Sequence, residues 1–167
     1  MKYFKRLKIY KSSTGNNTFD PLTKKAHSYN WWLYCTKSPC GEYVIFNNTT
    51  YSSTTSKHQR DTWSLLGNNY KMIVLNNTRQ SLGNLSEAFR DEIDGLLSIN
   101  YDLQKAIDKP RSRKATNIKR TIEIKDNIDR VFELLGYMKK WDMDTSKVKL
   151  FKHTTVIKDI EQIRKGV

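Results

Sequence analysis

Residues 27–60 read HSYNWWLYCTKSPCGEYVIFNNTTYSSTTSKHQR, and this stretch predicts the fold of the first half of the chain. Aromatic and β-branched runs at Tyr29–Thr36 and Glu42–Asn47 predict two strands. The KSPCG segment between them contains a proline and a glycine, which favour a hairpin with a loop of about five residues. The hydroxyl-rich run that follows offers several N-caps for a helix over Ser56–Leu66, which we expect to bury its tryptophan and its last leucine.

The segments on either side of this stretch complete a small β-rich domain. Lys2–Tyr10 alternates imperfectly and predicts a basic strand, and Lys11–Thr18 has the Gly, Asn, Ser and Thr content of a turn. The short apolar run Tyr70–Leu75 predicts a further strand. The polar segment Asn76–Gly83 predicts a loop and a domain boundary.

The second half of the chain has the period of amphipathic helices. Apolar residues recur at spacings of three and four, first behind Ser86 as the expected N-cap and up to Lys109-Pro110, then again up to residues 136–140. The two stripes are Phe89, Ile93, Leu96, Leu97, Leu103 and Ile107, followed by Ile118, Ile122, Ile128, Val131, Leu135 and Met138. Two such helices with a short linker predict an antiparallel hairpin. Residues 147–165 predict a short strand and a short helix.

These patterns predict an α+β protein. Residues 1–83 are expected to form a small basic β-rich domain with one short helix, and residues 84–167 a helical hairpin with a short C-terminal strand and helix. A chain of 167 residues can bury a hydrophobic core. Its 37% hydrophobic and 11% aromatic content argues against wholesale disorder.

The charge of the chain points to a polyanionic partner. The formal net charge is +13, and twelve of the 30 cationic side chains, but three of the 17 acidic ones, lie before Gly83. A basic excess of this size is typical of nucleic-acid-binding proteins. Lys109–Arg120 holds six cations and no acid, which indicates a second phosphate contact or, alternatively, an ordinary solvated loop.

The lack of a predicted targeting segment and the low cysteine content indicate a reduced, cytoplasmic setting. No stretch is long and apolar enough to span a membrane, and the charged residues 1–13 lack the apolar region of a signal peptide. Cys35 and Cys40 are too few for a disulfide scaffold. With His27 and His58 they can be arranged as a zinc site, but the C-x4-C spacing is loose and two ordinary thiols fit better.

The sequence gives little support to a catalytic function. His153-Thr154-Thr155 has the H-x-T form of two-histidine phosphodiesterases, but no second such motif accompanies it. The acids of the basic half are far apart, so they do not predict a Mg²⁺ nuclease centre. No phosphate-binding glycine loop is present. We therefore expect no metal, no cofactor and no catalysis.

Nucleic-acid binding accounts for more of the residues. Hydroxyl and amide side chains can bond phosphate oxygens, exposed rings can stack on unpaired bases, and the start of the helix after Thr55 can read base edges in a duplex groove. At least one of Trp31 and Trp32 is expected to be buried, as tryptophans of small β domains usually are. The candidate contact residues are Lys24, Lys25, Tyr29, Asn30, Trp31, Trp32, Lys37, Tyr51, Ser53, Thr54, Lys57, His58, Gln59, Arg60, Arg111, Arg113 and Lys114.

Two segments, NTFDPLTKKAHSYNWW and VIFNNTTYSSTTSKHQ, carry a family resemblance. Over about residues 17–60 the chain resembles a small uncharacterised protein family of large tailed bacteriophages. The resemblance implies a setting, the cytoplasm of an infected host bacterium, and no catalytic residues.

Two functions fit this setting. The first is a non-catalytic phage protein that binds DNA or RNA through a basic, aromatic- and hydroxyl-rich face. The alternative is an inhibitor or modulator of a host defence or transcription complex, acting by protein–protein contact through the hairpin. A nuclease or phosphodiesterase is a weaker third hypothesis. The residues leave the oligomeric state open.

Overall fold

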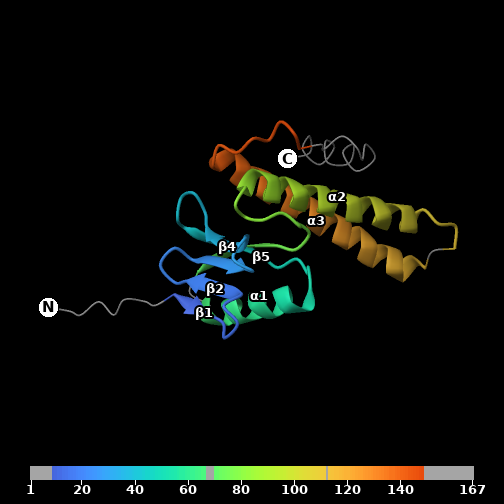
Figure 1. Cartoon of the computed structure of the whole chain (residues 1–167). Coiled ribbons are helices and arrows are strands. Elements are labelled where there is room, and N and C mark those ends of the chain that lie inside the picture. The colour runs from blue at the N-terminus through green and yellow to red at the C-terminus, as the bar shows by residue number, and fades with distance from the viewer. Residues whose placement is uncertain (1–8, 67–69, 112, 149–167) are drawn as a thin grey trace. The chain divides into compact units, whose positions relative to one another are not determined.

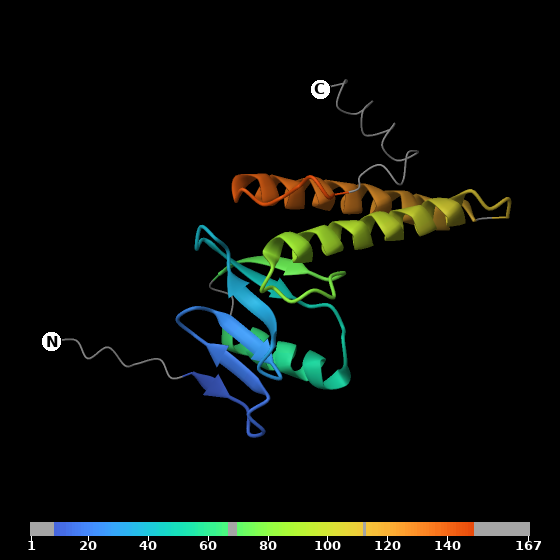
Figure 2. The ribbon, with the colours of Figure 1, turned by 45° about the horizontal axis from the view of Figure 1, so that its top comes forward.

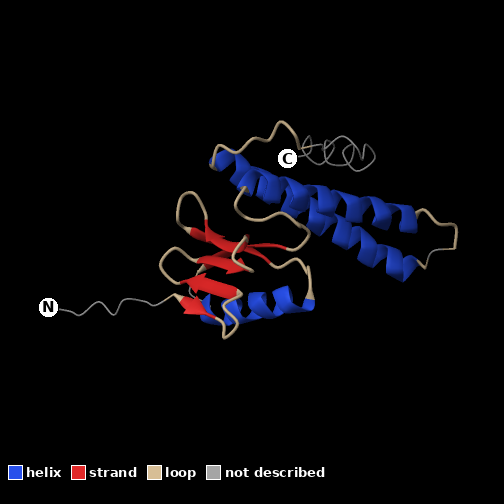
Figure 3. Cartoon of the chain, in the orientation of Figure 1, coloured by secondary structure: helices blue, strands red, loops and turns tan. Residues whose placement is uncertain are grey.

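The structure is a computed structural model that describes residues 9–66, 70–111 and 113–148 (Figure 1). The chain divides into two compact units between Ala88 and Phe89. A sheet with one helix forms the first unit and two long helices form the second, so the predicted α+β class is confirmed (Figure 3). The predicted C-terminal strand and helix, and the predicted first strand up to residue 8, lie outside the described residues.

The first unit is built on a six-stranded sheet whose strands follow one another in sequence order. Its strands are β1 (Tyr10–Lys11), β2 (Asn17–Asp20), β3 (Lys25–Ser28), β4 (Trp32–Lys37), β5 (Tyr43–Asn47) and β6 (Lys71–Leu75). Strands β1 to β5 form an antiparallel meander, whereas β6 runs parallel to β5. A parallel neighbour requires a crossover, and helix α1 (Ser53–Leu66) supplies it (Figure 2).

The predicted hairpin forms between β4 and β5. Its loop has the expected five residues but is shifted by one position, to residues 38–42, and Gly41 takes a φ of +76°, which glycine adopts without strain. The strand predicted from Tyr29 begins only at Trp32. Residues 29–31 instead make the turn from β3, because Tyr29 and Asn30 both take positive φ angles, 54° and 65°.

Helix α1 packs on one face of the sheet through its buried residues Thr55, His58, Gln59, Thr62 and Leu66. The cluster beneath it consists of Phe19, Ala26, Trp32, Tyr34, Cys35, Val44, Phe46 and Leu66. The helix starts at Ser53, earlier than predicted, because Ser52 Oγ caps it by accepting a hydrogen bond from Thr55 N–H at 3.1 Å. Trp63 was predicted to be buried, but it is 44% exposed and meets Phe46 edge-on.

The loop after β6 returns to β4. Leu82 N–H donates to the Leu33 carbonyl at 2.8 Å, and both side chains are buried. This contact helps to explain why the strand that contains the WWLY run is buried on both faces, without an alternation of polar residues.

The second unit confirms the predicted antiparallel hairpin of α2 (Leu85–Ile107) and α3 (Lys114–Lys140). The predicted N-cap of α2 is wrong by two residues. Asn84 Oδ1, rather than the Ser86 hydroxyl, accepts the hydrogen bond from Glu87 N–H. Asn is as effective at this position as Ser.

The predicted apolar stripe of α3 is partly out of phase with the helix interface. The buried positions are Ile124, Val131, Leu134 and Met138, whereas Ile118 and Ile122 are each 55% exposed. Polar residues take the inward positions that precede them: Asn117 donates to the Ile107 carbonyl, and Arg120 donates to the Ala106 carbonyl. Asn127 also lies on the inward face of α3. Because several inward positions are polar, hydrophobic periodicity alone predicted the wrong face for the first turns of the helix.

An amide pair, formed by the buried Asn100 and the half-buried Asn127, joins the middle of the two helices. Asn100 is 1% exposed, its Nδ2 donates to the Ile124 carbonyl, and its Oδ1 accepts from Asn127 Nδ2 at 2.8 Å. We expect Asn127→Ala to lower the stability of the hairpin by about 1–2 kcal/mol, because it leaves a buried amide oxygen without a donor. Chemical denaturation followed by circular dichroism at 222 nm measures this. The double variant Asn100→Leu/Asn127→Leu should regain part of the loss, and a single variant as stable as the native chain would contradict the prediction.

Candidate nucleic-acid interface

Strand directions define one end of the sheet, which we call the aromatic end. It comprises the turns at residues 12–16 and 29–31, the loop at residues 48–52 and the first turn of α1. These segments meet because Asn17 pairs with Ser28 and Ser28 with Trp32, and because β4 starts where its antiparallel neighbour β5 ends. Tyr29 N–H also donates to the Asn16 carbonyl, which joins the two turns directly.

Three large rings are exposed at the aromatic end. Trp31 is 66% exposed, Tyr51 is 62% exposed and Tyr29 is 43% exposed. Tyr51 stacks on Trp32 with ring centroids 5.9 Å apart, and Tyr29 lies 5.7 Å from the His58 ring. Each tyrosine is therefore supported from behind by a buried ring, and it retains exposed surface on which a ligand can stack.

Trp32 has a different role from the one predicted. It is 5% exposed and stacks on Tyr34 as well as on Tyr51. This confirms that one of the paired tryptophans is buried. Trp32 therefore supports the exposed ring of Tyr51 and has little surface left for contact with a base.

His58 and Gln59 are also buried, which removes them from the predicted contact set. Gln59 Nε2 donates to the carbonyls of Asn47 and Thr49 at 2.8 and 3.2 Å. The His58 ring shares a 2.8 Å hydrogen bond between Nδ1 and Ser28 Oγ. Both side chains fix α1 to the sheet, so neither can read base edges in a groove. The polar character of His58 and Gln59 predicts exposed positions. Only the packing of α1 on the sheet shows that both side chains are buried.

A buried hydroxyl network holds α1 in place. The Tyr34 side chain is fully buried, and its hydroxyl donates to Asn17 Oδ1 at 2.7 Å. The same oxygen lies 2.7 Å from Thr62 Oγ1 and 3.1 Å from the His58 carbonyl. This network joins β2, β4 and α1 directly behind the aromatic end.

The predicted cations do not gather at one place. The hydroxyls of Ser53 and Thr54 are exposed in the first turn of α1, at the aromatic end. Lys57 is exposed one turn further along, and Arg60 is exposed in the middle of the helix, beside Asp61. Asn30 is exposed in the adjoining turn.

Lys24, Lys25 and Lys37 lie at the opposite end of the strands. Lys37 is five residues along β4 from Trp32, roughly 17 Å at the usual rise per residue. The Lys24 ammonium sits 4.4 Å from the centroid of the Tyr70 ring, next to the start of β6. These three predicted contacts therefore do not share a surface with the rings of the aromatic end. Position in the sequence could not show this. Successive strands of the meander run in opposite directions, so consecutive turns lie at opposite ends of the sheet.

Lys11 was missed by the sequence reasoning. It pairs with Thr18 next to the turn at residues 12–16, and it is exposed. The Gly- and Asn-rich turn that follows Lys11 was the sequence feature that could have identified it.

The loops of the aromatic end contain no carboxylate. Among the described residues of the first unit, Asp20 and Glu42 lie at the far end of the strands, Asp61 lies in the middle of α1, and Glu87 lies in the first turn of α2. Asp20 accepts hydrogen bonds from the Thr23 hydroxyl and from Leu22 N–H, which lower the pKa of its carboxyl group. The distribution of acids leaves the aromatic end suited to an anion.

The buried histidine makes the stability of the first unit depend on pH. Burial lowers the pKa of His58 from its ordinary value of 6.5; Lys57 acts in the same direction, and Asp61 opposes it. Burial also lowers the pKa of His27. The unfolded chain therefore binds these protons at a higher pH than the folded chain does, so protonation favours unfolding.

We expect the free energy of unfolding to be highest above about pH 7 and to fall as the pH drops from about 7 to 5. Urea denaturation at several pH values in this window, followed by tryptophan fluorescence, measures the slope. His58→Gln should flatten it and leave the part due to His27. A native slope of zero would contradict the assignment.

The remaining predicted contacts, Arg111, Arg113 and Lys114, are exposed in the second unit, where α2 turns into α3. They form a separate group from the aromatic end, described below.

The candidate nucleophiles among the described residues differ in their exposure. The Ser28 hydroxyl beside His58 is fully buried, so a substrate cannot reach it. Burial raises the pKa of the Cys35 thiol to about 12, whereas Cys40 is exposed in the β4–β5 loop. Within residues 9–66, 70–111 and 113–148, no three His, Cys, Asp or Glu side chains gather as a metal site. His153 lies outside these residues.

Comparisons with known proteins add no relative. No protein-family model, curated protein or solved structure matches the chain. Within the described part of the chain, no helix combines the length and the apolar character that crossing a membrane requires.

Proposed function

We propose that this chain is a non-catalytic protein that binds single-stranded nucleic acid at the aromatic end of its sheet. The observation that supports the proposal is the set of three exposed rings, Tyr29, Trp31 and Tyr51, on loops that carry no carboxylate. Successive unpaired bases can stack on such rings, at about 1–3 kcal/mol per base.

The neighbouring groups suit the backbone of the same strand. Lys57 and Arg60 can pair with phosphates, and the hydroxyls of Ser53 and Thr54 and the amide of Asn30 can donate to phosphate oxygens. None of these contacts depends on the base, so the binding should be largely independent of sequence.

Burial of His58 and Gln59 favours a single strand over a duplex. A helix that reads a duplex needs exposed polar side chains at its start to reach base edges. Two of the four candidate side chains for that task, His58 and Gln59, are hydrogen-bonded inside the first unit. In a duplex the bases are already stacked on one another, so exposed rings gain little from it.

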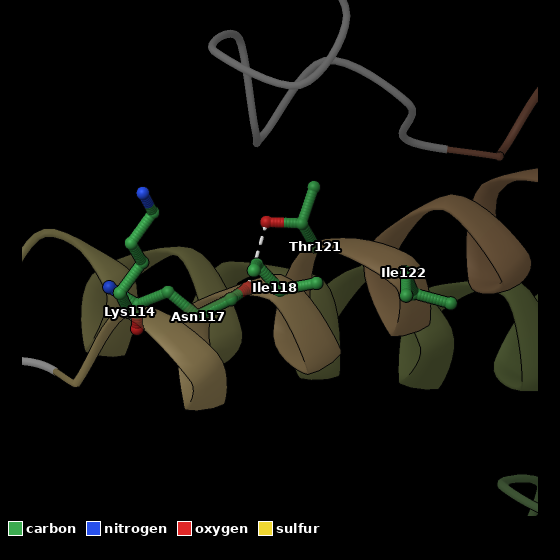
Figure 4. Close-up of a pocket in the computed structure, with 5 residues that line it drawn as sticks. All are labelled: Lys114, Asn117, Ile118, Thr121 and Ile122. Atoms are coloured by element: carbon green, nitrogen blue, oxygen red, sulfur yellow. Dashed lines mark hydrogen bonds between the residues drawn. The ribbon is translucent and has the colours of Figure 1, made fainter.

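The resemblance to a phage family supplies the proposed setting, the cytoplasm of an infected bacterium. A second function, a modulator of a host defence or transcription complex, is favoured by one observation. Ile118 and Ile122 are exposed side by side on α3, in a shallow groove that Lys114, Asn117 and Thr121 complete (Figure 4). Such a groove can accept an apolar side chain of a partner protein.

A pair of charge variants tests whether the aromatic end carries the binding. We expect Lys57→Gln/Arg60→Gln to reduce the slope of log affinity against log salt concentration by about 1.4 for an oligothymidine, because each lost phosphate contact to a single strand removes about 0.7. Fluorescence anisotropy between 50 and 300 mM salt gives the slope. The matched control is Lys25→Gln/Lys37→Gln, which removes the same charge from the opposite end of the sheet.

The control variant should keep the native slope. Equal losses in both variants would show that only net charge matters, and they would contradict a localised interface. Absence of oligonucleotide binding by the native chain at 50 mM salt would remove the proposed function and leave the protein-modulator alternative.

A further inference from the structure

The tip of the helical hairpin contains a cationic pocket apart from the aromatic end. It has a volume of about 350 Å³ and lies between the last turn of α2 and the first two turns of α3. Its lining residues are Ala106, Lys109, Arg111, Arg113, Thr116 and Arg120. Four of these six side chains are cations and none is an acid, so the pocket has the charge of an anion-binding site.

The start of α3 adds to this positive charge. The N-cap residue is Arg113, whose side chain makes no capping hydrogen bond, and Lys114 follows it in a first turn without an acid. Helices normally place acceptors and acids here, because the N-terminus already carries about half a positive charge. Each cation at this position is therefore unfavourable for the free helix, and an anion would relieve the repulsion.

Arg120 is held in position on one side of the pocket. Its Nη1 donates to the Ala106 carbonyl at 3.3 Å and to Asn117 Oδ1 at 3.1 Å. These bonds join the end of α2 to the second turn of α3 and orient the guanidinium group before any ligand arrives. Arginine in a fixed orientation is well suited to phosphate, since its planar donors match the oxygens of the anion.

We propose that this pocket binds a phosphate group of a nucleic-acid backbone. Arg111 and Arg113 pair with the phosphate oxygens from the linker, Arg120 pairs from the helix, and Thr116 contributes its hydroxyl. The pocket lining contains no aromatic side chain, so the contact recognises phosphate and is independent of base identity. The choice of nucleic acid as the partner rests on the function proposed above, whereas phosphate recognition by the pocket rests on the tip alone.

The competing partner is an anionic membrane. Ile118 and Ile122, which line a separate groove on α3, are apolar groups of the kind that enter a lipid surface (Figure 4). Vesicles of phosphatidylglycerol therefore form one arm of the test.

The first experiment tests phosphate recognition in the full chain. Inorganic phosphate is titrated at constant ionic strength while amide signals are followed by ¹H–¹⁵N NMR. We expect saturable shifts of the Lys114, Ala115 and Thr116 amides, and their loss in Arg111→Gln/Arg113→Gln. Both arginine side chains are exposed, and the Arg113 side chain makes no capping hydrogen bond. The control Lys125→Gln/Lys139→Gln removes two exposed lysines from α3 away from the tip and should keep the shifts.

Absence of these shifts, or equal loss in the control variant, would overturn the pocket.

The second experiment identifies the partner. For an oligothymidine, Arg111→Gln/Arg113→Gln should reduce the salt slope by about 1.4, whereas quenching of the tryptophan fluorescence at saturation should persist. Binding of the native chain to phosphatidylglycerol vesicles but not to the oligonucleotide would overturn the nucleic-acid assignment.

The two proposals fail separately. A slope reduced by the tip variant but unaffected by Lys57→Gln/Arg60→Gln would support the pocket and reject the aromatic end. The reverse result would reject the pocket as a contact of the nucleic acid.

Discussion

Replacing Tyr34 with phenylalanine is expected to lower the free energy of unfolding of the first unit by about 2–3 kcal/mol. The substitution keeps the ring but removes the hydroxyl, so Asn17 Oδ1 loses its donor and Thr62 Oγ1 loses its partner at 2.7 Å. Asn17, Tyr34 and Thr62 are all fully buried, so water cannot replace the lost bonds. Each buried polar group without a partner costs about 1–3 kcal/mol.

The loss should appear as a lower thermal midpoint, by roughly 4–8 °C for each kcal/mol in a domain of this size. Tryptophan fluorescence during thermal or urea denaturation reports mainly on the first unit, which contains three of the four tryptophans, Trp31, Trp32 and Trp63. The matched control is Tyr70→Phe, which removes a hydroxyl from an exposed tyrosine and should change stability by less than about 0.5 kcal/mol. If both variants behave alike, the buried network does not stabilise α1 on the sheet.

Replacing Trp31 and Tyr51 together with alanine is expected to weaken binding of a single-stranded oligonucleotide by about 2–4 kcal/mol, at least 30-fold. Both rings are more than half exposed in the free protein, so the fold loses little when they are removed. The effect should therefore fall on binding, while the circular dichroism spectrum and the thermal midpoint stay close to the native values.

Fluorescence anisotropy with a labelled oligothymidine measures the affinity, and a duplex of equal length provides the comparison. The duplex should bind more weakly and should be affected less by the double variant. Tyr70→Ala is the control, because Tyr70 is exposed next to β6 at the opposite end of the strands. Equal losses for Tyr70→Ala, or for the duplex and the single strand, would contradict stacking at the aromatic end.

Local patterns predicted most of the elements. The five-residue loop between β4 and β5, the strand at Lys71–Leu75 and the two long helices follow from turn residues and from hydrophobic period. The predictions were wrong where a residue type is common in two kinds of structural position. Tyr29 looked like a strand residue but takes a positive φ in a turn, and Ile118 looked like a core residue but is exposed.

The candidate site was less predictable than the fold. The sequence selected Tyr29, Trp31 and Tyr51 as possible stacking rings, because large aromatic residues in a polar, acid-poor stretch are unusual for a core, and the structure shows all three to be exposed. It also selected His58 and Gln59, which have the side chains of surface contacts but form the buried bonds that hold α1. No local pattern separates these two cases, since both depend on which face of α1 meets the sheet.

The amino-acid sequence by itself determined the α+β class, the strongly basic charge and the supply of rings, hydroxyls and cations, because these depend on composition and on short-range period. Only the tertiary structure decided which of these groups share a surface. Strand register places Lys37 far from Trp32 on the same strand, and packing turns Trp32 inward beside an outward Trp31. Contacts between residues distant in the chain make these choices, and such contacts exist only once the sheet has formed.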